Sequence, residues 1–247
     1  MSENEYRDYV EEIRSAISRG DIYQANACRI LSRPVQSRDL RGLFTSLLLN
    51  NPAPYSCYFN IDGCEIASAS PENFLTLEGE HDAVRLTTSP IKGTSTISDF
   101  GEKDRAENIM IVDLMRNDLG EICVPGSIEV GRLCAIESHP GLFHLVSDIS
   151  GIFRDSYEAL SKILPAGSIS GAPKSSAVEM IRTKEGQRGP YCGILGYIKR
   201  NDGKVSGKLS VAIRIFWREG QTLKFGTGAG ITWGSEPQAE WEETELK

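Results

Sequence analysis

The sequence predicts an α+β fold in which large antiparallel sheets are covered by helices. Its strand-like runs come in pairs joined by short turns, and its helices come in separate groups, unlike the strand–helix alternation of a parallel sheet. The turns at Asp62–Gly63 and Asn201–Gly203 each separate two such runs. Since no Pro/Ser-rich linker divides the 247 residues, we expect one domain over residues 1–247.

The first part of the chain is expected to form two helices and then paired strands. Apolar residues recur at helical spacing over residues 4–19, and Gly20 follows as a stop. A second helix fits residues 40–49, after strand-compatible residues at 22–31. The strands expected next are 55–61, 65–69, 74–77 and 83–88.

The middle of the chain is expected to be helical, and its last third returns to strands. The pattern over residues 103–119 predicts a helix that ends at Gly120. Its expected apolar side consists of Ala106, Ile109, Met110 and Leu114. Further helices fit residues 156–164 and 173–184, with Pro173 in the first turn of the second. The remaining expected strands are 194–200, 208–217 and 222–226.

Charge and cysteine usage exclude several classes of function. Lys and Arg number 27 against 34 Asp and Glu, and the resulting net charge of −7 argues against nucleic acid as a partner, because phosphate binding needs a basic patch. No apolar stretch approaches the ~20 residues of a membrane span and the N-terminus is acidic, so we expect a cytoplasmic protein without a membrane partner. The six cysteines form no CxxC pair, which predicts buried thiols rather than a zinc site.

Two pairs of carboxylates have the spacing of a metal site. Asp104 and Glu107 share one face of a predicted helix, and Glu240 and Glu243 repeat that spacing on a final helix. Four carboxylates from two helices fit Mg²⁺, which prefers oxygen ligands. Two solvated helix faces are the alternative, because acidic residues are favoured in first turns anyway. Pro237 lies in the first turn of the final helix, with Ser235 and Gln238 as its expected capping box.

Two short segments could bind or attack a substrate. The segment GTGAG at residues 226–230 is expected to be a loop after a strand, whose backbone N–H groups can approach an anion, or else a tight turn. Lys92 lies in PIKGT at the end of an extended segment. It is either a surface charge or, if desolvated, a free amine that acts as nucleophile or base.

Two polar residues interrupt apolar stretches. His144 lies in LFHLVS, where a hydrogen-bonded core histidine and a catalytic histidine are both compatible with the pattern. Arg214 interrupts the strand-like run LSVAIRIFW, where a charge requires a partner. A substrate carboxylate is a natural partner, because guanidinium grips it bidentately.

Taken together, these segments resemble the chorismate-utilising enzymes. The resemblance covers nearly the whole chain and keeps the family's order of motifs, which read here GDIYQAN, SASPENF, PIKGT, DRAENIMIVDLMRNDLG, HLVSDISG, GSISGAPK, YCGILGY, VAIRIF and GTGAGITWGSEPQAEWEET. It implies a chorismate-binding, two-lobed sandwich of large antiparallel sheets. Relatives of this kind carry a further N-terminal lobe, which we expect to be absent from these 247 residues.

The resemblance also implies roles for individual residues. Glu107 and Glu243 match direct ligands of Mg²⁺, and Asp104 and Glu240 match residues that hold its water molecules. Glu72 looks like the general acid that assists departure of the C4 hydroxyl, and His144 matches a histidine near the ring. The positions that match substrate-binding residues are Gly93, Thr94, Ser168, Tyr191, Arg214, Gly228, Ala229, Gly230 and Lys247.

Two positions distinguish the branches of the family. Isochorismate and salicylate synthases carry a lysine base where this chain has Gln24, which disfavours activation of water at C2. PIKGT is similar to aminodeoxychorismate synthases, whereas anthranilate synthases usually read PIAGT. In the lysine branch, Lys92 would attack C2 as the C4 hydroxyl leaves, and ammonia would then add at C4.

The resemblance therefore implies an aminodeoxychorismate synthase component I, which makes 4-amino-4-deoxychorismate for the 4-aminobenzoate and folate route. Its ammonia is expected from a separate glutamine amidotransferase subunit, because no glutaminase cysteine motif is evident in the sequence. The alternatives are an anthranilate synthase component I and a non-catalytic chorismate-binding module.

Overall fold

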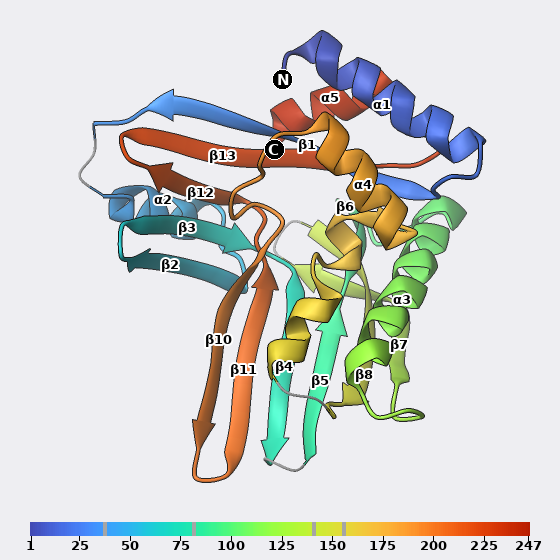
Figure 1. Cartoon of the computed structure of the whole chain (residues 1–247), viewed down its shortest axis with the longest axis vertical. Coiled ribbons are helices and arrows are strands. Elements are labelled where there is room, and N and C mark those ends of the chain that lie inside the picture. The colour runs from blue at the N-terminus through green and yellow to red at the C-terminus, as the bar shows by residue number, and fades with distance from the viewer. Residues whose placement is uncertain (37–38, 81–82, 140–141, 155–156) are drawn as a thin grey trace. The chain divides into compact units, whose positions relative to one another are not determined.

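The computed structural model describes residues 1–36, 39–80, 83–139, 142–154 and 157–247. The chain folds into two compact units, each assembled from separate stretches of sequence (Figure 1). Unit 1 contains Met1–Pro71, Ile169–Gly193 and Ala212–Lys247, and unit 2 contains Glu72–Ser168 and Ile194–Val211. Each unit has one antiparallel sheet with helices packed on it, which confirms the predicted α+β class. No helix within the described ranges is long and apolar enough to cross a membrane.

The sheet of unit 1 has six strands in the order β2-β3-β12-β13-β1-β9. Their bounds are Gln24–Pro34 (β1), Tyr55–Ile61 (β2), Cys64–Ser70 (β3), Gly171–Ala172 (β9), Ile215–Glu219 (β12) and Thr222–Ile231 (β13). The helices of this unit are Glu3–Ser18 (α1), Arg41–Asn50 (α2), Lys174–Lys184 (α4) and Pro237–Leu246 (α5). In Figure 1, α1 and α5 lie side by side over β1 and β13.

Helix α1 forms where the apolar spacing predicted it, and its N-terminus is closed by a capping box. The Ser2 hydroxyl accepts the Glu5 N–H, and the Glu5 carboxylate accepts the Ser2 N–H at 2.6 Å. Its apolar face lies in a core that also contains Ile22, Ala27 and Ile231. This packing seats α1 against the strands that carry several predicted binding residues.

The sheet of unit 2 runs β10-β11-β4-β5-β8-β6, with β7 paired to β8 outside that path. The strand bounds are Asn73–Glu80 (β4), Ala83–Ser89 (β5), Ile91–Ser95 (β6), Glu129–His139 (β7), Leu142–Ile152 (β8), Ile194–Asn201 (β10) and Lys204–Val211 (β11). Helix α3 (Glu102–Ile122) packs along β8 and β7 (Figure 1). Both predicted hairpin turns form, with positive φ at Asp62 and Gly63 and at Asp202 and Gly203.

Helix α3 differs from its prediction at its end and on its buried face. Gly120 lies inside the helix, because Leu119 and Ile122 on either side of it are fully buried and hold the last turn against the core. The predicted apolar side is also wrong, since Ile109 is 47% exposed. The buried side contains Asn108, Ile111, Val112, Met115, Asp118, Leu119 and Ile122.

Helix α3 was mispredicted because its buried side includes polar residues. The Asn108 amide donates to the Leu145 carbonyl at 3.1 Å, and its oxygen accepts the Ser147 hydroxyl at 2.5 Å. A buried polar side chain whose hydrogen bonds are satisfied is compatible with a core. A prediction from apolar spacing treats such a residue as exposed, so it assigns the wrong side of the helix to the core.

Four further expectations are corrected in the second half of the chain. The predicted strand 208–217 is two strands, β11 and β12, because the chain breaks at Arg214, whose φ is +48°. The GTGAG segment is not a loop but part of β13, paired with β1. The capping box at Ser235 does not form, because the Ser235 hydroxyl accepts the Thr232 N–H at 3.1 Å and α5 begins at Pro237. The predicted helix 156–164 is a 3₁₀ helix, Tyr157–Ile163 (η1), and its first expected residue lies outside the described ranges.

Candidate active site

The predicted site residues divide between the two units. Unit 2 carries Glu72, Lys92, Gly93, Thr94, Asp104, Glu107, His144 and Ser168. Unit 1 carries Tyr191, Arg214, Gly228, Ala229, Gly230, Glu240, Glu243 and Lys247. Each unit therefore carries part of the predicted set, and within each unit several of these residues lie close together.

A β-bulge in β6 sets the position of Lys92. The register of β6 against β8 shifts between Ile91 and Thr94, so Lys92 and Gly93 are the irregular residues. Gly93 has a φ of +86°, and a Cβ there would lie 3.0 Å from the Phe100 ring. A side chain at that position would be strained by the backbone conformation and crowded by the Phe100 ring. The bulge holds Lys92 half-buried at the edge of the sheet.

Glu72 immediately precedes β4, and the residue as a whole is 8% exposed. The Val211 N–H donates to the backbone carbonyl of Glu72 at 3.1 Å, which anchors the chain at this residue. Burial raises the pKa of the Glu72 carboxyl above its ordinary value, although a hydrogen bond with Ser168 and the charge of Lys92 act in the opposite direction. Glu72, Ser168 and Lys92 thus form one cluster, in which Glu72 retains its proton to higher pH than an exposed glutamate.

His144 lies on β8 between two strands, opposite Thr94 on β6 and opposite Glu137 on β7. His144 is 8% exposed, so the residue is buried rather than open to solvent. His144 pairs with Thr94, which is two positions after Lys92 on β6. His144 therefore lies next to the bulge that contains Lys92. The geometry is compatible with both interpretations of His144, and its catalytic role stays a prediction.

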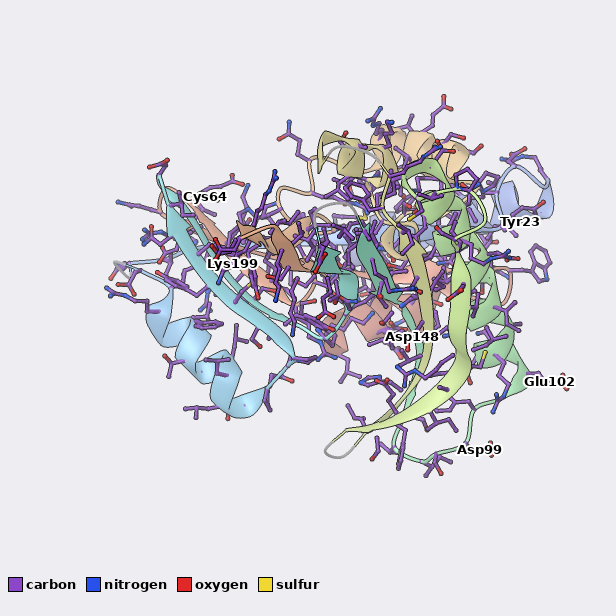
Figure 2. All side chains as sticks on the ribbon, turned by 90° about the horizontal axis from the view of Figure 1, so that it is seen from below. Tyr23, Cys64, Asp99, Glu102, Asp148 and Lys199 are labelled. Atoms are coloured by element: carbon purple, nitrogen blue, oxygen red, sulfur yellow. The ribbon has the colours of Figure 1, made fainter. Side chains whose placement is uncertain are left out.

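The start of α3 lies against the same bulge. A Cβ on Gly93 would be 3.4 Å from the Asp104 Cβ, so Asp104 is a neighbour of β6. The Asp104 carboxylate accepts the Gly101 N–H at 3.2 Å, and Glu107 lies one turn later with its Oε1 4.0 Å from Lys103 Nζ. Figure 2 shows the nearby Asp99 and Glu102 pointing outward at the edge of this unit. The predicted metal carboxylates are therefore distinct from those at the exposed tip of the helix.

In unit 1, β13 passes its glycine-rich segment beneath two buried side chains. A Cβ on Gly226 would lie 2.1 Å from the Tyr191 ring, and a Cβ on Gly228 would lie 2.7 Å from Cys28 Sγ. Pairing of β13 with β12 ends at Phe225, whereas pairing with β1 continues to Ile231. Among the described residues, no strand pairs with that edge of β13 beyond Phe225. Backbone N–H groups of alternate residues point to this edge, where they can meet an anion.

Tyr191 lies near the end of the segment Ile169–Gly193 of unit 1, and Arg214 lies near the start of the segment Ala212–Lys247. Tyr191 is 6% exposed, and burial raises the pKa of its phenol well above the ordinary value. Arg214 is exposed in the break that precedes β12, and its carbonyl accepts the Ala69 N–H at 3.0 Å. The positive φ of Arg214 turns its side chain out of the alternation of the strand that was predicted there.

Helix α5 carries the second pair of carboxylates and links one of them to β13. Lys247 Nζ lies 2.5 Å from Glu243 Oε1 and donates to the Gly228 carbonyl at 2.8 Å. Three predicted site residues are therefore joined in one chain of contacts. Glu240 lies one turn earlier on the same helix.

The sequence analysis missed the residues that anchor α5. Arg29 of β1 is 5% exposed, stacks on Trp241 with its guanidinium carbon 4.0 Å from the ring centroid, and donates to the Thr244 hydroxyl at 2.9 Å. It also forms an ion pair with Glu245. No local pattern could have revealed this set, because Arg29 and α5 lie at opposite ends of the sequence.

The carboxylate donors fit a hard divalent cation. Each unit presents two of the four, at adjacent turns of one helix, and oxygen is the ligand atom that Mg²⁺ prefers. Among the described residues, no group of three or more His, Cys, Asp or Glu that could hold a metal ion is found, so the Mg²⁺ site stays a prediction. The chemistry of the donors, rather than their grouping, is what supports Mg²⁺.

Two curated relatives match the chain equally well. Anthranilate synthase component 1 of Saccharolobus solfataricus is 36% identical over 264 residues, covering 100% of this chain and 61% of the relative. Aminodeoxychorismate synthase component 1 of Salmonella typhimurium is 36% identical over 263 residues, covering 99% of this chain and 56% of the relative. The chain thus spans somewhat more than half the length of these relatives.

Solved structures show the same fold. Anthranilate synthase component I from Streptococcus pneumoniae matches with a TM-score of 0.86 and 30% identity, covering 100% of this chain and 57% of that one. A putative 2,3-dihydroxybenzoate-specific isochorismate synthase from Bacillus anthracis matches with a TM-score of 0.79 and 21% identity, covering 99% of this chain and 69% of that one, and shares the fold alone. The family model described as chorismate binding enzyme matches residues 1–247. The chain therefore belongs to the chorismate binding enzyme family.

Proposed function

We propose that this chain acts on chorismate as an aminodeoxychorismate synthase component I, producing 4-amino-4-deoxychorismate with ammonia as the nitrogen donor. The observation that carries the proposal is the cluster of Lys92, Glu72 and Ser168 in unit 2. A lysine on a β-bulge beside a carboxyl group whose pKa is raised can supply a nucleophile and an acid to one substrate.

The proposed reaction begins with proton transfer from Glu72. Its carboxyl group donates a proton to the C4 hydroxyl, which leaves as water, while the Lys92 amine forms a bond to C2 and loses a proton. Ammonia then forms a bond to C4 and loses a proton, the bond between Lys92 and C2 breaks as the ring double bonds shift back, and the Lys92 nitrogen takes up that proton. The raised pKa of Glu72 supports its part, because the acid must be protonated when the substrate binds.

The remaining predicted residues are assigned to binding. Arg214 and Tyr191 bind the enolpyruvyl carboxylate, together with those backbone N–H groups of residues 228–230 that face the unpaired edge of β13. Glu107 and Glu243 hold Mg²⁺, with Asp104 and Glu240 holding its water molecules. The ion, when bound, neutralises the ring carboxylate of chorismate. Glutamine amidotransferase is the proposed partner, as the source of ammonia.

Anthranilate synthase component I is the second candidate. Equal identity to the Saccharolobus solfataricus and Salmonella typhimurium proteins supports both functions alike. Lys92 favours the first, because an amine that occupies C2 directs ammonia to C4, whereas without it ammonia enters at C2 and gives the ortho product. A chorismate-binding module without catalytic activity is the third candidate.

The test is incubation with chorismate, Mg²⁺ and ammonium at mildly alkaline pH, with the product identified by mass and chromatography. We expect aminodeoxychorismate from the wild type, and loss of product or a change to anthranilate with Lys92→Ala. Lys199→Ala is the matched control, because Lys199 is an exposed lysine on β10 (Figure 2) and should leave the product unchanged.

Three results would refute parts of the proposal. Anthranilate from the wild type would favour the second candidate. Chorismate binding without any product would favour the binding module. The same aminodeoxychorismate yield from Lys92→Ala as from the wild type would exclude the covalent role of Lys92.

A further inference from the structure

Two cysteines that are far apart in sequence meet in the buried part of unit 1. Cys28 lies on β1, and Cys192 directly follows Tyr191. Both are buried, at 2% and 7% exposure. The Asn26 side-chain nitrogen lies 3.3 Å from Cys28 Sγ and 3.8 Å from Cys192 Sγ, so one amide contacts both sulfur atoms. The two thiols also interact directly with one another.

A buried ion pair borders these thiols. Arg188 donates to Glu185 at 2.6 Å and to the Asn26 carbonyl at 2.7 Å. Glu185 in turn accepts the Cys28 N–H at 2.9 Å and the Tyr9 hydroxyl at 3.1 Å. The charges of both Arg188 and Glu185 therefore act on the two thiols, Arg188 favouring the thiolate form and Glu185 opposing it.

The network gives the two thiols different acidities. Burial raises the pKa of the Cys28 thiol, and its interaction with Cys192 raises it further. Burial acts against ionisation of Cys192 as well, but the hydrogen bond from Cys28 and the charge of Arg188 outweigh it, so the pKa of Cys192 lies below the ordinary value. One thiol is suited to be the nucleophile, and the other retains its proton.

We propose that Cys28 and Cys192 are a redox-active dithiol, which peroxide oxidises to a disulfide within unit 1. The Cys192 thiolate attacks one oxygen of hydrogen peroxide, the O–O bond breaks, and a sulfenic acid forms while the departing hydroxide takes up a proton to become water. Cys28 then attacks the sulfenic sulfur, an S–S bond forms, and the hydroxide leaves with the proton of Cys28 as a second water. Two thiols are oxidised, one peroxide is reduced, and a dithiol reductant reverses the change.

The pair is placed to affect the substrate-binding half of unit 1. Cys192 is bonded to Tyr191, whose ring covers Gly226, and Cys28 Sγ covers Gly228. The Cys192 N–H is held by the Ala212 carbonyl at 2.9 Å, and its φ is +64°, so the backbone there has little freedom to adjust. Bond formation between the sulfur atoms therefore moves Tyr191 or β1. The prediction that oxidation weakens chorismate binding rests on the proposed function, whereas the disulfide itself does not.

The first experiment maps the disulfide in the wild-type chain. The protein is treated with dilute hydrogen peroxide, unreacted thiols are blocked under denaturing conditions, and peptides are analysed by mass spectrometry without reduction. We expect a cross-linked peptide pair containing Cys28 and Cys192, and two fewer titratable thiols than the six of the reduced chain. Oxidation of other cysteines while Cys28 and Cys192 remain free thiols would overturn the proposal.

Two variants separate the pair from general oxidation. Cys64→Ser removes an exposed cysteine at the outer end of the β2–β3 hairpin (Figure 2) and should leave the cross-link unchanged. Cys28→Ser should trap Cys192 as a sulfenic acid, detected with a dimedone probe, with no intramolecular cross-link. A cross-link that persists between Cys192 and another cysteine in this variant would contradict the assigned pair.

A binding measurement separates this inference from the proposed function. Chorismate binding with Mg²⁺ is measured by equilibrium dialysis on the reduced, oxidised and re-reduced protein. We expect binding several-fold weaker after oxidation and restored by dithiothreitol. A mapped disulfide with unchanged binding would overturn the effect on chorismate binding, and a mapped disulfide without any chorismate binding in the reduced protein would instead refute the proposed function.

Discussion

Replacement of Gly226 by alanine tests whether the Tyr191 ring sets the space above β13. The Cβ of alanine would lie 2.1, 2.4 and 2.6 Å from three ring atoms, whereas ordinary contacts begin at 3.4 Å. The ring must therefore retreat by about 1.3 Å, the difference between 3.4 and 2.1 Å. Tyr191 is 6% exposed, so its neighbours must move with it. Overpacking of this kind lowers the free energy of unfolding by about 1–3 kcal/mol, and we expect the upper part of that range.

The assay is urea unfolding of four proteins: wild type, Gly226→Ala, Tyr191→Ala and the double variant. If the clash is with the ring, Gly226→Ala should cost about 1–2 kcal/mol less when Tyr191 is already alanine. Gly234→Ala is the matched control, since a Cβ there meets no atom within 4 Å, and it should change stability by no more than about 0.5 kcal/mol. An equal cost of Gly226→Ala in both backgrounds would refute the reasoning.

Two further predictions concern unit 2. Because the folded state holds the pKa of Glu72 above its unfolded value, the folded protein binds the extra proton between those two pKa values, and stability falls as pH rises through that window. Glu72→Gln should therefore have a higher free energy of unfolding than the wild type at pH 8 but not near pH 4. Urea unfolding at both pH values measures the difference, and a stabilisation that does not change with pH would contradict this prediction. Asn108→Ala should lower the free energy of unfolding by about 1–3 kcal/mol, because it removes the amide that donates to the Leu145 carbonyl and the oxygen that accepts the Ser147 hydroxyl. Ile109→Ala, on the exposed side of the same helix, should lower the free energy of unfolding by less. If a thermal melt showed Ile109→Ala to be the more destabilising of the two, the buried face would be the one that the apolar pattern predicted.

Local physical chemistry is sufficient for the elements that the sequence analysis placed correctly. Helix α1 has its apolar residues at one helical spacing and its capping box within its first turn, so every determinant lies within a few residues. The hairpin turns at Asp62–Gly63 and Asp202–Gly203 likewise depend only on residues that tolerate positive φ. For the same reason, the paired carboxylates of α3 and α5 were identifiable from their spacing.

The tertiary structure decided what depends on distant partners. The buried face of α3 includes Asn108 because β8 supplies its hydrogen bonds, and the GTGAG segment is a strand because β1 pairs with it. Burial in the folded unit raises the pKa of Glu72, and Ser168 and Lys92, which lie far from it in sequence, act against that rise. Cys28 and Cys192 were expected to be buried thiols, and only the fold brings them together near Arg188. Short-range patterns thus determine helices, turns and residue types, whereas burial and charge depend on contacts that the chain makes only after it folds.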